Sequence, residues 1–264
     1  METRLGRFPA ETELPDPLKF AWPIVVLPEL FTTTRHLATL IGYLSSIGWE
    51  VFAPDLHAIA AGEALDFAKL TDFAAEAVAA VGRETIVVGH GIGGLIALKL
   101  AERLPLKAAV AVAPLAPGFP TPMFMNLGNR IRTWQGRELN PPTRRMLFEF
   151  VADADPHSRA QIIKTLTPAV TAAALVVVKD KITFGTSLVP RLIVAGESDI
   201  FAPYDKLDAF AHRLGVPIVK IRGHGHWLIG GRALERTIYE VQRFLVRSLG
   251  RDLLLLYPEE WKSE

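Results

Sequence analysis

Short apolar segments alternate along the chain with segments whose apolar residues recur at the three- and four-residue spacing of a helix. Runs such as "PIVVL" at 23–27 and "TIVVGH" at 85–90 have the length of buried strands, and each is followed by a helical pattern. This alternation predicts stacked β-α units that form a mostly parallel sheet with helices on both faces. With 264 residues, the chain is long enough to bury such a sheet in one large domain.

The alternation stops in the middle of the chain and then resumes. Between residues 117 and 188 the stretches "PGFPTP", "NPPTRR" and "DADPHS" separate helical segments, and a strand pattern returns with "RLIVAGESD" at 191–199. We therefore predict an α/β core made of residues 1–116 and 189–264, with a helical cap inserted at 117–188.

Composition and charge exclude several classes of function. Lys and Arg total 29 against 28 acidic residues, so no broad positive field attracts nucleic acid or an anionic membrane. The apolar runs are strand-length and too short to span a bilayer. The chain has no cysteine, which excludes a thiolate nucleophile, and its histidines show no ligand spacing. We expect a small-molecule partner, no nucleic acid, no membrane, no metal and no cofactor.

The N-terminal segment bears on location. "METRLGRFPAETELPDP" is interrupted by charges and prolines and lacks the apolar core of a secretory signal. A cytoplasmic protein is the resulting expectation.

A glycine-rich turn, "GHGIGG" at 89–94, joins one strand pattern to a helix pattern. It matches the G-x-G-x-x-G of dinucleotide-binding folds, but that fold needs an acidic residue about 20 positions further on. The next strand ends in "VAVAPLAPG", which offers no carboxylate. The turn fits better as a nucleophile elbow, G-x-S-x-G, whose apex would be Gly91.

The elbow predicts an acid after a later strand and a histidine after the last strand, in that order along the chain. Asp199 follows one apolar strand pattern and His226 follows another, so both lie where the order requires. His224 is two residues earlier and is the second candidate for the base.

At this point the chain resembles the α/β-hydrolase superfamily over nearly its full length. The resemblance implies the α/β-hydrolase fold, a mostly parallel central sheet flanked by helices, with a helical cap after the sixth strand. It also implies that Asp199 orients the histidine, that His226 is the general base, and that the N–H of Ile92, after the apex, is an oxyanion donor. The stretches that carry the resemblance are "VVLPELF", "GWEVFAPDL", "GHGIGG", "GESDIFAP" and "GHGHW".

The loop after the first apolar strand departs from the superfamily. Most relatives have His-Gly there, whereas this chain has "LPELF", which makes Leu30 the second expected N–H donor. The phrase is similar to the His-Glu-Ile-Phe of dienelactone hydrolases, in which the glutamate lies beside a cysteine nucleophile. Glu29 could face the pocket and act as acid or base. Alternatively it could be a surface residue, paired with Arg35 or Arg132.

Glycine at the apex excludes a covalent intermediate at position 91. Three accounts of Gly91 follow. The chain could be a cofactor-independent enzyme that performs acid-base chemistry of the lyase, dehydratase, cyclase or isomerase type, or directs a water; this is the account we expect. It could be a non-catalytic ligand-binding protein. It could also be an esterase-like serine hydrolase with an inactivating serine-to-glycine substitution.

The expected cap suggests the character of the substrate. Phe124, Met125 and Trp134 belong to an aromatic- and methionine-rich stretch that suits an adaptable apolar pocket, with His90 beside the apex. We expect a small apolar carbonyl compound. Ordinary packing within the cap would explain the same residues.

Overall fold

The computed structural model describes residues 2–56, 66–119, 127–135, 137, 139–141, 143–167 and 181–255. Its core is one eight-stranded sheet with the strand order β1-β2-β4-β3-β5-β6-β7-β8. β1 and β2 pair antiparallel, as do β2 and β4, and all the other neighbours are parallel. The strands are β1 (Glu2–Leu5), β2 (Phe8–Glu13), β3 (Ile24–Leu27), β4 (Val51–Pro54), β5 (Ile86–His90), β6 (Ala108–Val112), β7 (Arg191–Gly196) and β8 (Ile218–Ile221).

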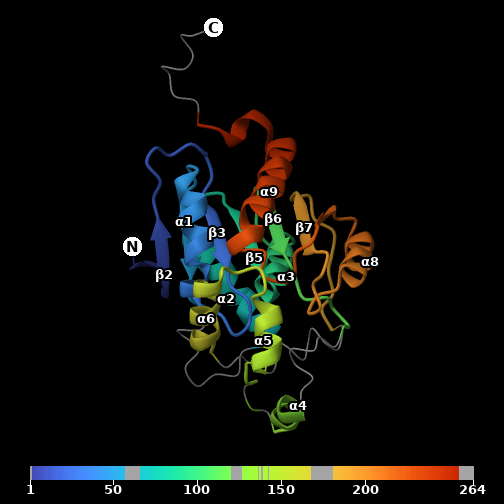
Figure 1. Ribbon diagram of the computed structural model, residues 1–264. Helices are drawn as coiled ribbons and strands as arrows, with labels where there is room; N and C mark the ends of the chain where they lie inside the picture. Colours follow the sequence, from blue (N-terminus) through green and yellow to red (C-terminus); the bar gives the residue numbers. More distant parts are fainter. Residues whose placement is uncertain are drawn as a thin grey trace.

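Four adjacent inner strands, β3, β5, β6 and β7, are buried at every position. Such uninterrupted apolar strands are expected where helices cover both faces of a parallel sheet. Figure 1 shows α1 and α9 on one face and α2 and α3 on the other. The helices are α1 (Ala38–Ser46), α2 (Phe67–Ala79), α3 (Ile92–Leu100), α4 (Leu127–Trp134), α5 (Arg144–Phe150), α6 (Pro156–Thr165), α8 (Tyr204–Leu214) and α9 (Leu234–Leu249), with short 3₁₀ turns η1 (Thr34–Leu37), η2 (Gly231–Ala233) and η3 (Gly250–Leu253).

The predicted parallel β-α arrangement is confirmed, and the N-terminal hairpin is an addition to it. Charges and prolines conceal the strand pattern of β1 and β2, which form the edge of the sheet next to β4. β1 is the edge strand, where exposed charged side chains are tolerated, whereas β2 lies between β1 and β4 and alternates buried with more exposed residues.

Between β6 and β7 the chain forms α4, α5 and α6, which lie together at one end of the molecule (Figure 1). The boundaries of a cap at 117 and 188 stay a prediction. Within the described ranges, no helix has both the length and the hydrophobicity needed to cross a membrane.

The last helix offers a direct test of how the sheet is covered. On α9, Leu245 is fully buried, whereas its neighbour Val246 is 55% exposed. We predict that Leu245→Ala lowers the free energy of unfolding by about 2–5 kcal/mol, because it leaves a cavity against the sheet. Val246→Ala, the matched control, should change it by less than about 0.5 kcal/mol. Urea unfolding measures both values, and equal losses would contradict this placement of α9.

Candidate active site

The turn between β5 and α3 brings the strand and the helix so close that side chains have no room. A Cβ on Gly89, in β5, would overlap the carbonyl of Gly93 in α3, and a Cβ on Gly93 would come within 2.5 Å of the carbonyl oxygen of Leu27, at the end of β3. Gly91, at the apex, has φ 55° and ψ −116°, a conformation that strains any residue with a side chain. The sharp turn predicted from "GHGIGG" is therefore present, with Gly91 as its apex.

Glu29 occupies the space beside this apex. A Cβ on Gly91 would overlap the carboxylate of Glu29, whose side chain is fully buried. A side chain at position 91 and Glu29 in its present place therefore exclude each other. The structure places Glu29 in the interior rather than on the surface, and neither Arg35 nor Arg132 is its partner.

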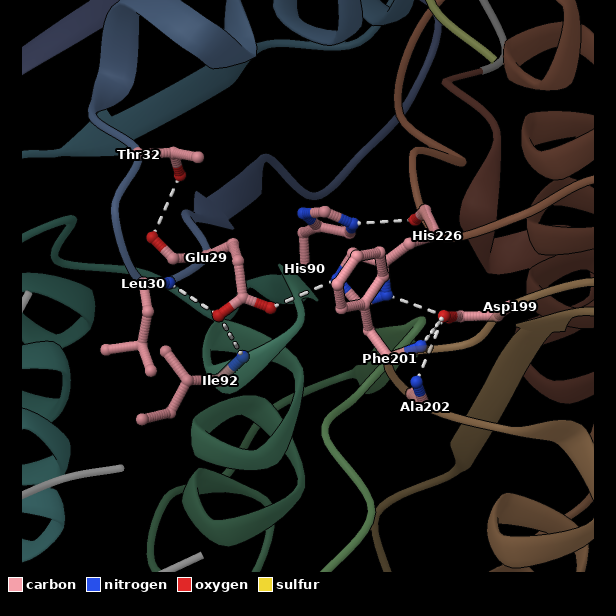
Figure 2. Close-up of polar contacts among 9 residues, drawn as sticks. All are labelled: Glu29, Leu30, Thr32, His90, Ile92, Asp199, Phe201, Ala202 and His226. Carbon is pink, nitrogen blue, oxygen red and sulfur yellow. Dashed lines mark hydrogen bonds and ion pairs between the residues drawn. The ribbon is translucent and has the colours of Figure 1, made fainter. Parts of the chain in front are cut away.

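Two backbone N–H groups hold this carboxylate. Oε1 of Glu29 accepts hydrogen bonds from the N–H of Leu30 at 2.5 Å and from the N–H of Ile92 at 3.1 Å (Figure 2). Leu30 and Ile92 are the two residues expected to donate to a substrate oxyanion. Both N–H groups point at the same position, and Oε1 of Glu29 occupies it.

His226 lies between two carboxylates. Its Nδ1 is 2.7 Å from Oδ2 of Asp199, and its Nε2 is 3.3 Å from Oε2 of Glu29 (Figure 2). Oδ1 of Asp199 accepts from the N–H groups of Phe201, at 2.8 Å, and Ala202, at 3.0 Å. The side chains of His226, Asp199 and Glu29, which the sequence places on three distant segments, are thus in one buried row.

The electrostatics of this row favour a protonated His226. Burial alone would lower its pKa, but the charge of Asp199, the hydrogen bond to it and the nearby carboxylate of Glu29 raise the pKa to about 10. Burial would likewise raise the pKa of Asp199, yet His226 and two backbone N–H groups bring the pKa below its ordinary value. At neutral pH, His226 is therefore an imidazolium flanked by carboxylates.

His90, the residue before the apex, is neutral. Burial, followed by the charge of His226, lowers its pKa to about 3. Its Nε2 lies 3.0 Å from the carbonyl oxygen of His226 and donates to it, while its buried Nδ1 has no protein partner among the described residues. His90 thus fixes the backbone of His226. Its ring also packs against those of His226 and Trp227, and its place in a substrate pocket stays a prediction.

His224, the second candidate for the base, lies outside the row. Its Nδ1 is 2.7 Å from Oδ1 of Asp153, in the segment between α5 and α6. Oδ2 of Asp153 accepts from the N–H of Gly225 at 2.8 Å. Asp153 therefore ties the helical insertion to the loop that carries His226, a contact that sequence spacing could not reveal.

The row is covered by aromatic side chains. The ring of Phe150, at the end of α5, lies 5.1 Å from the ring of His226, and that of Phe201 lies 5.6 Å from it. Phe124 and Met125, expected in the substrate pocket, fall outside the described residues, as does the side chain of Trp134, which ends α4.

A metal ion could find three ligand atoms here. Glu29, His90 and His226 each offer one, and all three lie within 4.8 Å of one another. The hydrogen bonds described above account for the positions of Glu29 and His226. The expectation of no metal stays a prediction.

Comparisons with known proteins give the family. Residues 20–238 match the model of the alpha/beta hydrolase family, and the chain belongs to that family. A search among curated proteins finds no match.

Solved structures agree on the fold. A monoacylglycerol lipase from Paleococcus ferrophilus is 19% identical with a TM-score of 0.67, over 90% of this chain and 99% of that one. A thermophilic esterase from Thermogutta terrifontis is 18% identical with a TM-score of 0.66, over 93% and 99%. The naproxen esterase of Bacillus subtilis is 15% identical with a TM-score of 0.67, over 92% and 91%. At such identities the likeness shows the fold alone.

The raised pKa of His226 makes a prediction for Glu29→Gln. The amide oxygen would keep the bonds to Leu30 and Ile92, so the uncharged NH₂ group would face Nε2 and the pKa of His226 should fall from about 10. Folding raises the pKa of His226, so its protonated ring stabilises the folded protein. This stabilisation is fully present below the unfolded pKa of 6.5 and is lost as the pH rises through about 10.

Nuclear magnetic resonance of the histidine ring nitrogens measures this pKa directly. Glu235→Gln, which neutralises an exposed glutamate on α9, is the matched control and should leave His226 unchanged. An ordinary pKa of 6.5 for His226 in the unaltered protein would contradict the flanking carboxylates.

Proposed function

We propose that this chain is a cofactor-independent enzyme in which the carboxylate of Glu29 replaces the serine nucleophile of its family. Glu29 is the general base and His226 the general acid in proton transfer on a small carbonyl compound. The observation that carries the proposal is the position of Oε2, which lies beside the apex and 3.3 Å from Nε2 of His226. Residues 117–188, which include Phe150, would form the cap of this site.

The two oxygens of Glu29 have different roles in this proposal. Oε1 is bound by the N–H groups of Leu30 and Ile92, which hold the carboxylate in place. Oε2 faces His226 and is the atom that takes a proton. The N–H pair that polarises a substrate in a serine hydrolase thus positions the base here, which revises the role expected for Leu30 and Ile92.

The reaction follows from the charges of the row. A carbonyl oxygen of the substrate replaces Oε2 of Glu29 as the acceptor of Nε2–H of His226, and the released Oε2 removes a proton from the adjacent carbon. The C–H electron pair forms the enol double bond, and the proton of His226 moves to the oxygen. Returning a proton to another carbon gives an isomer, and expelling a group from the β carbon gives an elimination. Asp199 keeps Nδ1 protonated throughout.

The alternative of an esterase-like serine hydrolase altered at position 91 has less support. A serine at 91 would overlap the carboxylate of Glu29 in its present position, so a serine form of the chain would need that flexible side chain to lie elsewhere. The non-catalytic alternative predicts ligand binding without proton transfer, and the next experiment separates it from the proposal.

The proposal predicts enzyme-catalysed exchange of α-hydrogens in deuterated water, followed by proton resonance on phenylacetone and cyclohexanone. Glu29→Gln should reduce the rate about 100-fold or more, the usual contribution of a general base, and His226→Gln should do the same. Glu235→Gln is the control and should retain the rate. Exchange no faster than in buffer, or exchange that survives Glu29→Gln, would contradict the assignment.

A further inference from the structure

A cavity of about 660 Å³ lies beside the buried row, between η1, α6 and the loop that follows His226. Trp227, the residue after His226, forms part of its wall, and Thr33 enters it from the loop that begins with Glu29. The cavity has the size of a small-ligand site and adjoins the reacting groups without containing them.

The wall of the cavity includes an indole ring. Trp227 is only 2% exposed as a residue, and its N–H is the polar group it can offer to a ligand. Its Nε1 lies next to Gly230, which also lines the cavity: a Cβ on Gly230 would come within 2.9 Å of it. An indole N–H beside a cavity can donate a hydrogen bond to a ligand oxygen.

The other lining groups mix donors and acceptors. Arg35 contributes a guanidinium that forms no ion pair within the described part of the chain, and Gln161 an amide that both donates and accepts. Asp55 and Asp155 supply carboxylates, and that of Asp155 accepts from the N–H groups that begin α6. Opposite charges and neutral polar groups in one cavity favour hydroxyl groups, since each hydroxyl donates and accepts.

We propose that this cavity binds the hydroxyl-rich, uncharged part of the substrate, such as a sugar or polyol, with Trp227 and Arg35 as donors to its oxygens. That this ligand is a substrate rests on the proposed function, whereas its binding to the cavity does not. The aromatic rings of Phe150 and Phe201 would then surround the apolar, carbonyl-bearing end of the substrate. The substrate would therefore have a polar end as well, in place of the wholly apolar compound expected from the sequence.

Calorimetry with methyl β-D-glucopyranoside tests the proposal without any turnover. The glucoside should bind the unaltered protein, and Trp227→Phe, which keeps a ring but removes the N–H, should weaken binding about 5- to 10-fold, as expected for one lost hydrogen bond. Gly230→Ala should weaken it similarly by covering Nε1. Gly42→Ala, where a Cβ meets nothing within 4 Å, is the matched control and should leave binding unchanged.

Gluconate and benzyl alcohol complete the experiment. Tighter binding of gluconate than of the glucoside would mean that an anion site at Arg35 dominates. Tighter binding of benzyl alcohol than of the glucoside would mean that the cavity takes apolar ligands. Either result overturns the proposal, as does the absence of glucoside binding or binding indifferent to both variants. Glucoside binding that persists in Glu29→Gln would leave this inference standing even if the deuterium exchange fails.

Discussion

The buried carboxylate of Glu29 needs compensation, because an ionised group removed from water is costly without close partners. Its partners are two backbone N–H groups and the imidazolium of His226. Each depends on a different part of the fold: Leu30 on the loop after β3, Ile92 on the start of α3, and His226 on the loop after β8. The positions of these three elements at one edge of the sheet are thus what makes the carboxylate possible there.

Gly91 and Glu29 are best understood as one feature. The turn conformation, which strains other residues, is kept although no nucleophile is attached to it. The volume that a side chain at 91 would take is filled by a carboxylate from a neighbouring loop. We infer that the glycine is required by the glutamate, so that the site has a different reacting group at the same place rather than a missing one.

The sequence predicted the sheet because hydrophobic periodicity encodes it, and chain order made Asp199 and His226 the candidate site residues. Asp199 and His226 follow strands, and strands that are parallel bring their carboxyl ends together. The hairpin of β1 and β2 was missed because its strands are short and carry charged side chains between their buried residues. The position of Glu29 stayed open between pocket and surface because its burial depends on space left by Gly91 and on N–H groups 1 and 63 residues away. The pairing of His224 with Asp153 across 71 residues has no local signal either.

The central claim is that Glu29 occupies the nucleophile's place, and fluorophosphonate labelling of two variants tests it most directly. Gly91→Ser alone should label no faster than the unaltered protein, because Glu29 blocks the hydroxyl and fills the N–H pair. Glu29→Gly combined with Gly91→Ser should label at position 91, with His226 as base and Leu30 and Ile92 free to hold the oxyanion. Labelling of Gly91→Ser alone as fast as the double variant would contradict the account, as would a folded double variant that does not label.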